Sequence, residues 1–162
     1  MFEFFKNKNT DSLASPCSGK CIDITEVNDA TFADKLMGDG VAITPSDNKT
    51  CSVCNGTIAM LIPTKHAFGL TTKDGLEILI HIGVDTVNLN GEGFKCYKSV
   101  GDKVKVGETI IEFDAKYLSD KNLDMTTMII LTKTEDKQFE KIAVGKEVTK
   151  GQIVMKKVGS EV

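Results

Sequence analysis

A chain of 162 residues, 41% hydrophobic and 27% charged, is long enough to bury a sizeable core in one globular domain. The formal net charge is −3 at pH 7 and all 20 basic residues are lysines, which argues against the basic surface that nucleic-acid binding requires. No apolar run approaches the roughly 18 to 20 residues of a membrane-spanning helix, and no signal-peptide pattern opens the chain, so we expect a cytoplasmic protein without stable membrane insertion.

The first residues differ in composition from the rest of the chain. Phe2, Phe4 and Phe5 are apolar, whereas Lys6–Ser12 is a polar run of the kind found in flexible segments. The sequence therefore predicts a flexible N-terminal arm over residues 1–15 and a single domain over residues 16–162.

Short segments rich in β-branched and aliphatic residues, separated by glycine-containing turns, follow from Pro16 onward. They predict strands over Lys20–Ile24, Val41–Thr44, Gly56–Ile62, Ala67–Thr71, Leu76–Ile82, Thr109–Phe113, Met128–Leu131, Lys141–Ala143 and Ile153–Val158. Only two helical turns are expected, over Phe32–Met37, closed by Gly38, and over Ala115–Leu118. The pattern is typical of an all-β protein.

Two pairs of segments repeat within the chain. Ser15–Lys20 recurs loosely as Ser52–Thr57, and Val100–Glu108 recurs as Val144–Gln152 with a shared Val-Gly-x-x-Val-x-x-Gly frame. Glycines flanking a buried valine suit a tight corner that is used twice. Because the period is not sustained, the repeats indicate a compact sandwich of two similar halves rather than a solenoid.

A titratable imidazole interrupts the apolar stretch Glu77–Val87. Alternation along a strand places Leu79, His81 and Gly83 on one face, so that His81 has a bare neighbour beside which a group could approach. A lone histidine on an apolar strand is more often a core side chain that is hydrogen-bonded to backbone. Other parts of the chain must decide between these interpretations.

A second histidine precedes the neighbouring strand. The same alternation places Thr64, His66 and Phe68 on one face, and Asp74-Gly75 predicts a hairpin turn between the two histidine segments. A bulge or an uneven loop is needed to bring His66 level with His81. Two facing imidazoles suit a shared zinc ion, a base for a nucleophile, or an imidazole that itself accepts a phosphoryl group. The last needs the fewest partners, since a catalytic zinc wants a third ligand and no nucleophile elbow is present.

Five cysteines make a disulfide framework unlikely, but two pairs have spacings compatible with zinc. Cys17 and Cys21 are four positions apart, and Cys51 and Cys54 are three apart. The alternative is that these side chains are small buried hydrophobes beside turn glycines.

Several blocks, in order along the chain, resemble the glucose-specific IIA component of the bacterial phosphoenolpyruvate-dependent sugar phosphotransferase system. They are Phe32–Ile43, Thr64–Phe68, His81–Val87, Gly91–Phe94 and Val104–Glu108. The resemblance implies an antiparallel β-sandwich, or barrel-sandwich, of two related halves. It also implies a phosphotransferase with a phosphohistidine intermediate and with neither metal nor cofactor.

Site residues follow from the same resemblance. His81 would take a phosphoryl group at Nε2 from the histidine phosphocarrier protein HPr and pass it to a cysteine on the IIB domain of a glucose-type permease. His66 would stabilise the phosphoryl group, and Thr64 would orient His66. Partner binding is implied for an acidic pair and an apolar rim, and further regulatory partners stay open. These residues are Asp29, Asp85, Phe32, Leu36, Met37, Ile62 and Leu79.

Two other classes of protein remain as alternatives. One is a structural zinc protein built on the cysteine pairs. The other is a lipoyl- or biotin-type carrier domain, because Met155-Lys156-Lys157 superficially resembles its attachment site. Such a lysine must lie at a hairpin tip with a strand after it.

Overall fold

The structure, a computed structural model, describes residues 10–159. Its strands are β1 (Ser12–Ala14), β2 (Gly19–Asp23), β3 (Asp39–Pro45), β4 (Lys49–Cys51), β5 (Gly56–Leu61), β6 (Ala67–Thr71), β7 (Glu77–Ile82), β8 (Phe94–Cys96), β9 (Lys103–Val104), β10 (Thr109–Phe113), β11 (Thr127–Lys133), β12 (Phe139–Lys141), β13 (Glu147–Val148) and β14 (Ile153–Lys157). Each strand that the sequence predicts is present within a few residues of its expected bounds. The strands missed by sequence reasoning are β1, β4, β8, β9 and β13, which are only two or three residues long.

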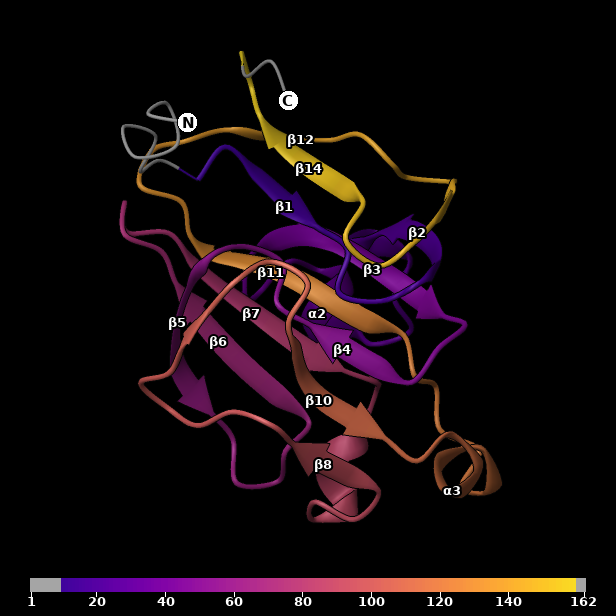
Figure 1. Cartoon of the computed structure of the whole chain (residues 1–162). Coiled ribbons are helices and arrows are strands. Elements are labelled where there is room, and N and C mark those ends of the chain that lie inside the picture. The colour runs from indigo at the N-terminus through magenta and orange to yellow at the C-terminus, as the bar shows by residue number, and fades with distance from the viewer. Residues whose placement is uncertain (1–9, 160–162) are drawn as a thin grey trace.

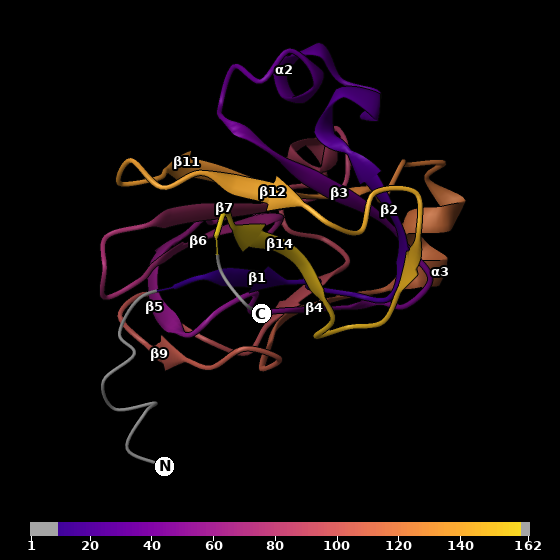
Figure 2. The same ribbon diagram turned by 90° about the horizontal axis from the view of Figure 1, so that it is seen from above.

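The strands form three antiparallel sheets. The large sheet has the order β13-β2-β3-β11-β7-β6-β5-β9, and the two small sheets have the orders β1-β14-β12 and β4-β10-β8. Figure 2 shows β1, β4 and β14 on one side of the large sheet and the short helix α2 (Ala30–Ala33) on the other. The predicted antiparallel β-sandwich with only short helical turns is therefore confirmed.

The two predicted halves correspond to the two ends of the large sheet, whose strands β2, β3, β11, β7, β6 and β5 are labelled in Figure 1. In the large sheet, β13-β2-β3-β11 and β9-β5-β6-β7 run inward from opposite ends to meet at the β11–β7 pair. The repeated corners make matching hydrogen bonds: Ser15 Oγ donates to the Cys17 carbonyl at 2.6 Å and Ser52 Oγ to the Cys54 carbonyl at 2.7 Å. The repeats seen in the sequence thus correspond to equivalent turns in the two halves.

Alternation along β7 separates two apolar clusters. Ile78, Ile80 and Ile82 face the main core between the large sheet and the small sheets, whereas Leu79 faces the other side, as predicted. That side carries a smaller cluster, here called the outer cluster. It consists of Ile24, Val27, Phe32, Ala42, Ala67, Leu79, Val84, Met128 and Ile130.

The segment of residues 24–38, here called the strap, covers the outer cluster between β2 and β3. It contains the 3-10 helix η1 (Ile24–Glu26) and α2 (Ala30–Ala33). The helical turn expected over Phe32–Met37 begins earlier because Asp29 caps α2, accepting a hydrogen bond from Thr31 N at 2.9 Å. The remaining helical elements are η2 (Thr86–Leu89) and α3 (Ala115–Asp120).

The domain begins earlier than predicted. Residues 1–9 of the predicted arm lie outside the described residues, but Ser12–Ala14, also assigned to the arm, form β1 and pair with β14. Leu13 is fully buried in the main core. The boundary at residue 15 is thus too late, because three ladder residues and one core side chain precede it.

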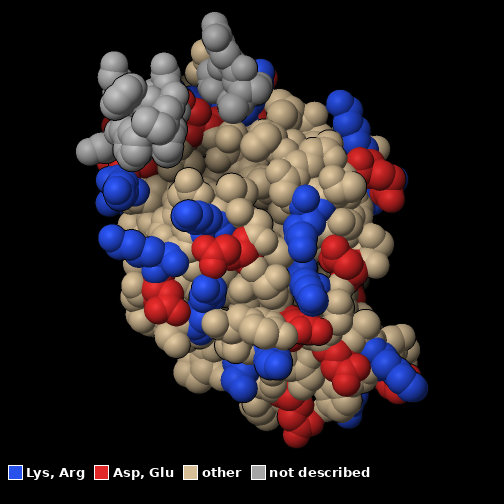
Figure 3. Space-filling model, viewed as in Figure 1, with Lys and Arg blue, Asp and Glu red and all other residues tan. Residues whose placement is uncertain are grey.

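The sequence argues against nucleic-acid binding and against a membrane-spanning helix, and the structure describes the surface and the helices concerned. On the face shown in Figure 3, lysines and acidic side chains are interspersed, so that no extended basic field covers it. Among residues 10–159, every helix is too short or too polar to cross a membrane.

Candidate active site

His81 lies on the outer face of the large sheet, near the end of β7. It is opposite Ala67 of β6 and opposite Met128 of β11, two members of the outer cluster. The strap adds Phe32, whose ring centroid lies 4.7 Å from that of His81 with the planes at 55°. The imidazole is therefore half-buried in an apolar setting, close to the protein surface.

The second histidine reaches His81 from the loop between β5 and β6. The ring centroids of His66 and His81 are 4.9 Å apart and their planes meet at 76°. His66 comes just before β6, and the preceding Lys65 has a left-handed backbone, with φ of 61°. The prediction that Thr64, His66 and Phe68 share one face of a strand is wrong, because His66 is outside the pleat and Phe68 faces the main core.

The register between β6 and β7 explains why no bulge is needed to bring the rings together. Thr71 pairs with Glu77, and the ladder continues without a shift to Ala67 and His81. The backbone of the adjoining loop continues this pairing, since Ile82 N donates to the His66 carbonyl at 2.7 Å. The predicted hairpin thus holds the two rings next to each other through one regular ladder.

The hydrogen bond at Nδ1 of His81 determines which ring nitrogen is free. Nδ1 lies 3.0 Å from the carbonyl oxygen of Gly83. A carbonyl oxygen can only accept, so in the neutral ring the proton resides on Nδ1 and the lone pair on Nε2. His81 therefore has a nucleophilic Nε2, with its tautomer fixed by the backbone two residues ahead.

Both imidazoles lie in surroundings that favour their neutral forms. Burial, and then the neighbouring His66, lower the pKa of His81 to about 4, opposed by the Gly83 hydrogen bond and by Asp29. Burial also lowers the pKa of His66. At pH 7 both rings are therefore neutral, and each has one protonated nitrogen and one nitrogen with a lone pair.

The Thr64 hydroxyl is in place to orient His66. Its Oγ1 lies 2.8 Å from Nδ1 of His66, and the His66 ring is buried, with 3% of its surface exposed. A ring held on one edge by a hydroxyl and packed against a second imidazole has little freedom to turn. Thr64, His66 and His81 form one contiguous group in the structure.

Gly83 does not play the part that its bare side chain suggested. Its φ is +78°, and a Cβ there would lie 2.5 Å from Thr86 Cγ2 and 3.1 Å from the Asp124 carbonyl. The space beside it is filled by protein, so the predicted open approach at Gly83 is wrong. The glycine is required because the chain turns sharply there and presents its carbonyl to His81.

The predicted apolar rim divides into buried and exposed members. Leu79 is 8% exposed within the outer cluster, and Ile62 packs against that cluster. Farther along the strap, Leu36 and Met37 are 74% and 41% exposed. The site thus combines a packed apolar base with large apolar side chains that face solvent.

The two predicted acidic residues have different environments. Asp29 caps α2 and is close enough to His81 to affect its pKa. Asp85 is exposed, with a left-handed backbone, φ 60°, at the start of η2, and its side chain makes no capping hydrogen bond. Asp29 therefore has a structural role as the cap of α2, whereas the side chain of Asp85 does not cap η2.

Sequence reasoning missed two contributions to the site. The Gly83 carbonyl holds Nδ1 of His81, and Met128 from β11 lies beside His81 in the ladder. The spacing of a histidine two positions before a glycine could have suggested the first, since a turn there folds the carbonyl back. The second depends on a long-range strand pairing for which the sequence carries no local signal.

The cysteines behave as buried thiols. Cys17, Cys21, Cys51 and Cys54 are all buried, and burial raises the pKa of Cys21 to about 11 and that of Cys54 to about 12. Among the residues described, no group of three or more histidine, cysteine or acidic side chains is arranged to hold a metal ion. The burial supports the packing interpretation of these cysteines.

The lipoyl or biotinyl alternative is not compatible with the position of Lys156. That lysine lies within β14, opposite Ser12 of β1 on one side and Glu140 of β12 on the other. An attachment lysine must project from a hairpin tip, whereas Lys156 is in the middle strand of a sheet.

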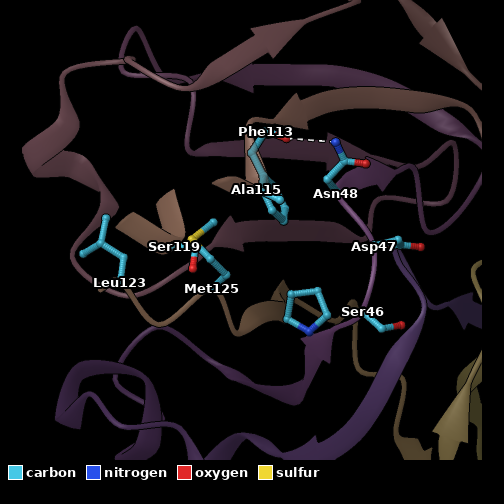
Figure 4. A pocket seen from close by; sticks show the side chains of 9 residues that line it. Ser46, Asp47, Asn48, Phe113, Ala115, Ser119, Leu123 and Met125 are labelled. Atoms are coloured by element: carbon cyan, nitrogen blue, oxygen red, sulfur yellow. Dashed lines mark hydrogen bonds between the residues drawn. The ribbon is translucent and has the colours of Figure 1, made fainter. Parts of the chain in front are cut away.

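A pocket of about 430 Å³ lies elsewhere in the molecule, next to α3 and the turn between β3 and β4. Figure 4 shows Phe113, Ala115, Ser119 and Leu123 around it, together with the Ser46–Asn48 turn. None of the predicted site residues lines this pocket. The candidate site is instead the shallow surface around the two imidazoles.

The chain is similar to known proteins over most of its length. Residues 11–137 match the family model described as phosphoenolpyruvate-dependent sugar phosphotransferase system, EIIA 1. The glucose-specific EIIA component of Bacillus cereus is 39% identical over 158 residues, which cover 98% of this chain and 96% of that protein. The solved glucose permease IIA from Mycoplasma capricolum has a TM-score of 0.84 at 40% identity and covers 93% of this chain and 97% of that one.

A fused relative also matches. The glucose-specific EIICBA component of Staphylococcus saprophyticus is 41% identical over 145 residues, or 90% of this chain. The chain spans only 21% of that longer protein.

Proposed function

Because the chain belongs to the EIIA 1 family of the phosphoenolpyruvate-dependent sugar phosphotransferase system, we propose that His81 is the residue that carries its phosphoryl group. The protein is an EIIA component, a phosphoryl carrier for sugar uptake. The observation that carries the assignment to His81 is the hydrogen bond from Nδ1 to the Gly83 carbonyl, which leaves a lone pair on Nε2 beside a second imidazole.

The first step transfers a phosphoryl group from the phosphohistidine of HPr. The Nε2 lone pair of His81 attacks phosphorus, the new N–P bond forms as the N–P bond of HPr breaks, and the electron pair returns to the HPr imidazole. The proton of His81 stays on Nδ1, which donates it to the Gly83 carbonyl oxygen, and this hydrogen bond stabilises the positive charge that develops on the ring. The protein contributes chiefly by positioning the two partners.

His66 stabilises the transferred group in this proposal. When the Thr64 hydroxyl donates to Nδ1 of His66, the ring proton is on Nε2, where it donates to a phosphoryl oxygen on His81. The edge-to-face packing of the rings supports this role, since the group on His81 would lie beside the second imidazole. Thr64 thereby selects the tautomer that is useful for transfer.

The surroundings of the site suit docking of a small protein. Leu36 and Met37 present exposed apolar side chains, and Phe32, Ile62 and Leu79 belong to, or pack against, the outer cluster. Asp29 and Asp85 would meet basic side chains of HPr at the edge. The same face serves each transfer in turn, because donor and acceptor must both reach Nε2 of His81.

The second step passes the phosphoryl group to a cysteine of a IIB domain. A glucose-type permease is the proposed acceptor, because the Bacillus cereus and Mycoplasma capricolum relatives are named for glucose. The name of the fused Staphylococcus relative, EIICBA, includes an A and a B component in one chain. The cysteine thiolate attacks phosphorus, the S–P bond forms as the N–P bond to His81 breaks, and the electron pair of that bond returns to Nε2 of His81. We place the reaction in the cytoplasm, where HPr and the IIB domain meet.

Labelling tests the assignment. Phosphoenolpyruvate, the general phosphotransferase enzyme and HPr should add one acid-labile phosphoryl group to the protein. His81→Gln should abolish the labelling, whereas His66→Gln should retain it and so control for folding and HPr binding. Labelling of His81→Gln at the unaltered rate would contradict the assignment.

A further inference from the structure

A single lysine joins the two ends of the strap. Asp23 is the last residue of β2, immediately before the strap, and Asp39 is the first residue of β3, immediately after it. Nζ of Lys141 donates to Oδ1 of both carboxylates, at 2.6 Å in each case. Lys141 itself belongs to β12, in a small sheet that is separate from β2 and β3. The strap is therefore fastened at its base by a residue far away in sequence.

The local contacts show a tight ionic junction. The side chain of Lys141 is 17% exposed, that of Asp23 26% and that of Asp39 51%. The second oxygen of Asp23 accepts from Thr25 N at 3.0 Å, so the same carboxylate that binds Lys141 also caps η1 at the start of the strap. Asp39 additionally faces Lys35 at 3.5 Å. Charge-assisted bonds with a largely buried partner hold both ends of the strap in one geometry.

The pKa values agree with this geometry. Burial by itself would raise the pKa of Asp23, but hydrogen bonds from Lys141 and Thr25 outweigh it and lower the pKa to about 2. Burial by itself would lower the pKa of Lys141, yet the two carboxylates raise it. All three groups are charged throughout the physiological range.

The middle of the strap contacts the imidazole of His81. Ile24, Val27 and Phe32 are the strap residues buried in the outer cluster, and the Phe32 ring packs directly on His81. Gly38, at the end of the strap, passes so close to β11 that a Cβ would lie 2.3 Å from the Leu131 carbonyl. The strap thus has a fixed path from the lysine junction to the ring that covers His81. Burial is the main cause of the low pKa of His81, and the Phe32 ring lies against that imidazole, so a movement of Phe32 that admits water should raise the pKa.

We propose that Lys141 is a positioning residue for phosphoryl transfer, because it fastens both ends of the strap that holds Phe32 against the imidazole of His81. This inference rests on the proposed function of His81. Lys141 acts through the strap and does not touch the reacting atoms. Loss of the junction lets the strap shift, admits water to the His81 ring and loosens the apolar surface that the strap presents to a partner.

Four variants test the proposal. Lys141→Met keeps most of the side-chain length and removes the charge, while Asp39→Asn weakens the junction at its more exposed end, which protects against global unfolding. Lys141→Arg keeps the positive charge and the hydrogen-bond donors, and it should retain part of the wild-type behaviour. Lys156→Met is the matched control, because Lys156 lies in the same small sheet and, among the described residues, forms its ion pair with Glu140 of β12, at 3.7 Å, and with no strap residue.

The first measurement is the pKa of His81, from an NMR titration of the histidine ring. Simple electrostatics predicts opposite shifts for the two variants, because Lys141→Met removes a positive charge and Asp39→Asn a negative one. Loosening of the strap predicts that both raise the pKa of His81 towards its ordinary value. The other charged groups that act on the ring, His66 and Asp29, are unchanged in all four variants.

The second measurement is the rate of labelling by phosphorylated HPr in a single turnover. We expect Lys141→Met to slow labelling by roughly tenfold, since a small misplacement at a transfer site is costly, and Lys156→Met to leave it unchanged. Opposite pKa shifts in Lys141→Met and Asp39→Asn, or an unchanged pKa and rate in Lys141→Met, would overturn the proposal. A wild-type protein that HPr does not label would instead overturn the function on which it rests, and the pKa measurement would still report on the strap.

Discussion

The imidazole rings of His66 and His81 meet edge to face, with their centroids 4.9 Å apart and their planes at 76°. Two protonated rings at this distance would repel each other, and burial disfavours the charge on each of them. The pair is therefore a neutral one at physiological pH. In such a pair, one ring can accept a phosphoryl group while the other donates a hydrogen bond to it.

The first prediction concerns ionisation. Burial lowers the pKa of His81 to about 4 from an ordinary value of 6.5, so the neutral nucleophile should persist in mildly acidic solution. Histidine ring shifts in an NMR titration should show His81 in its neutral form at pH 6, with a proton on Nδ1 alone. Labelling by phosphorylated HPr should then lose little of its rate between pH 7.5 and 6, beyond what HPr itself loses.

The same shift affects stability. Between pH 6.5 and about 4 the unfolded chain binds a proton at His81 that the folded chain does not, so the free energy of unfolding should fall as the pH falls through this window. The contribution is fully present above pH 6.5. In His81→Gln the pH dependence of urea unfolding in this window should be weaker, and an unaltered slope would argue against the depressed pKa.

His66 and His81 should differ in which transfer step they affect. His66→Gln keeps an amide donor near His81 but loses the imidazole that packs against it. We expect this variant to accept the phosphoryl group within a few-fold of the normal rate and to pass it to the IIB cysteine at least tenfold more slowly, because transfer needs stabilisation of the moving charge. Quenched-flow assays that start from the phosphorylated protein measure only the transfer from His81 to the IIB cysteine. Normal transfer to the IIB cysteine would remove His66 from the mechanism.

Thr64 provides a test of tautomer selection. Thr64→Val is close in shape but loses the hydroxyl that lies 2.8 Å from Nδ1 of His66, whereas Thr64→Ser keeps it. We expect Thr64→Val to resemble His66→Gln in the transfer assay, with a loss of roughly tenfold, about the value of one hydrogen bond to a developing charge. Thr64→Ser should be close to wild type. Equal rates in the two variants would show that the hydroxyl does not act on His66.

Gly83→Ala should be destabilising because of the close contacts at this turn. An added Cβ would lie 2.5 Å from Thr86 Cγ2 on a backbone with φ of +78°. Gly107→Ala is the matched control, with φ of +89° and open space around the added atom. Thermal or urea unfolding should show about 1 kcal/mol of backbone strain in both variants, and a further 1–3 kcal/mol from the clash at position 83 alone.

The contribution of β1, which lies within the predicted arm, can also be tested. Leu13 is fully buried, so Leu13→Ala should destabilise the domain by about 2–5 kcal/mol through the cavity that it leaves. Urea unfolding measures the loss. A change of less than 0.5 kcal/mol, within the usual range of a surface substitution, would mean that β1 contributes little to the fold.

The sequence predicts the part of the site that lies on a regular strand, where side chains alternate between two faces. Alternation placed His81 and Leu79 on one face of β7, and the structure has them there. The same rule failed for His66, because it lies in a loop after a left-handed residue, where alternation does not apply. The rule also suggested open space at Gly83, although Thr86 and Met125 from other turns fill it.

Contacts between residues far apart in the chain could not be predicted from the sequence. Lys141 meets Asp23 and Asp39 across more than 100 residues of chain, and a lysine beside acidic residues has no distinguishing spacing. Strands of two or three residues, such as β9 and β13, are too short to show a period at all. They were recoverable only as the corners of the repeat, because Val104 and Val148 occupy the same place in its two copies.

The relation between the two halves has a consequence for the stoichiometry of the carrier. In the β7–β11 pair, His81 is opposite Met128 and Leu79 is opposite Ile130, so exchanging the halves places Ile130 where His81 stands. The exchange also places the loop that bears His66 onto the strap that bears Phe32, since each joins the equivalent strands. Two connections with a common origin in the repeat thus deliver unlike rings to one imidazole. If His81 is the phosphoryl acceptor, a chain with two similar halves carries one phosphoryl group at a time. The other half then has a structural role, since it supports the imidazole without accepting a phosphoryl group.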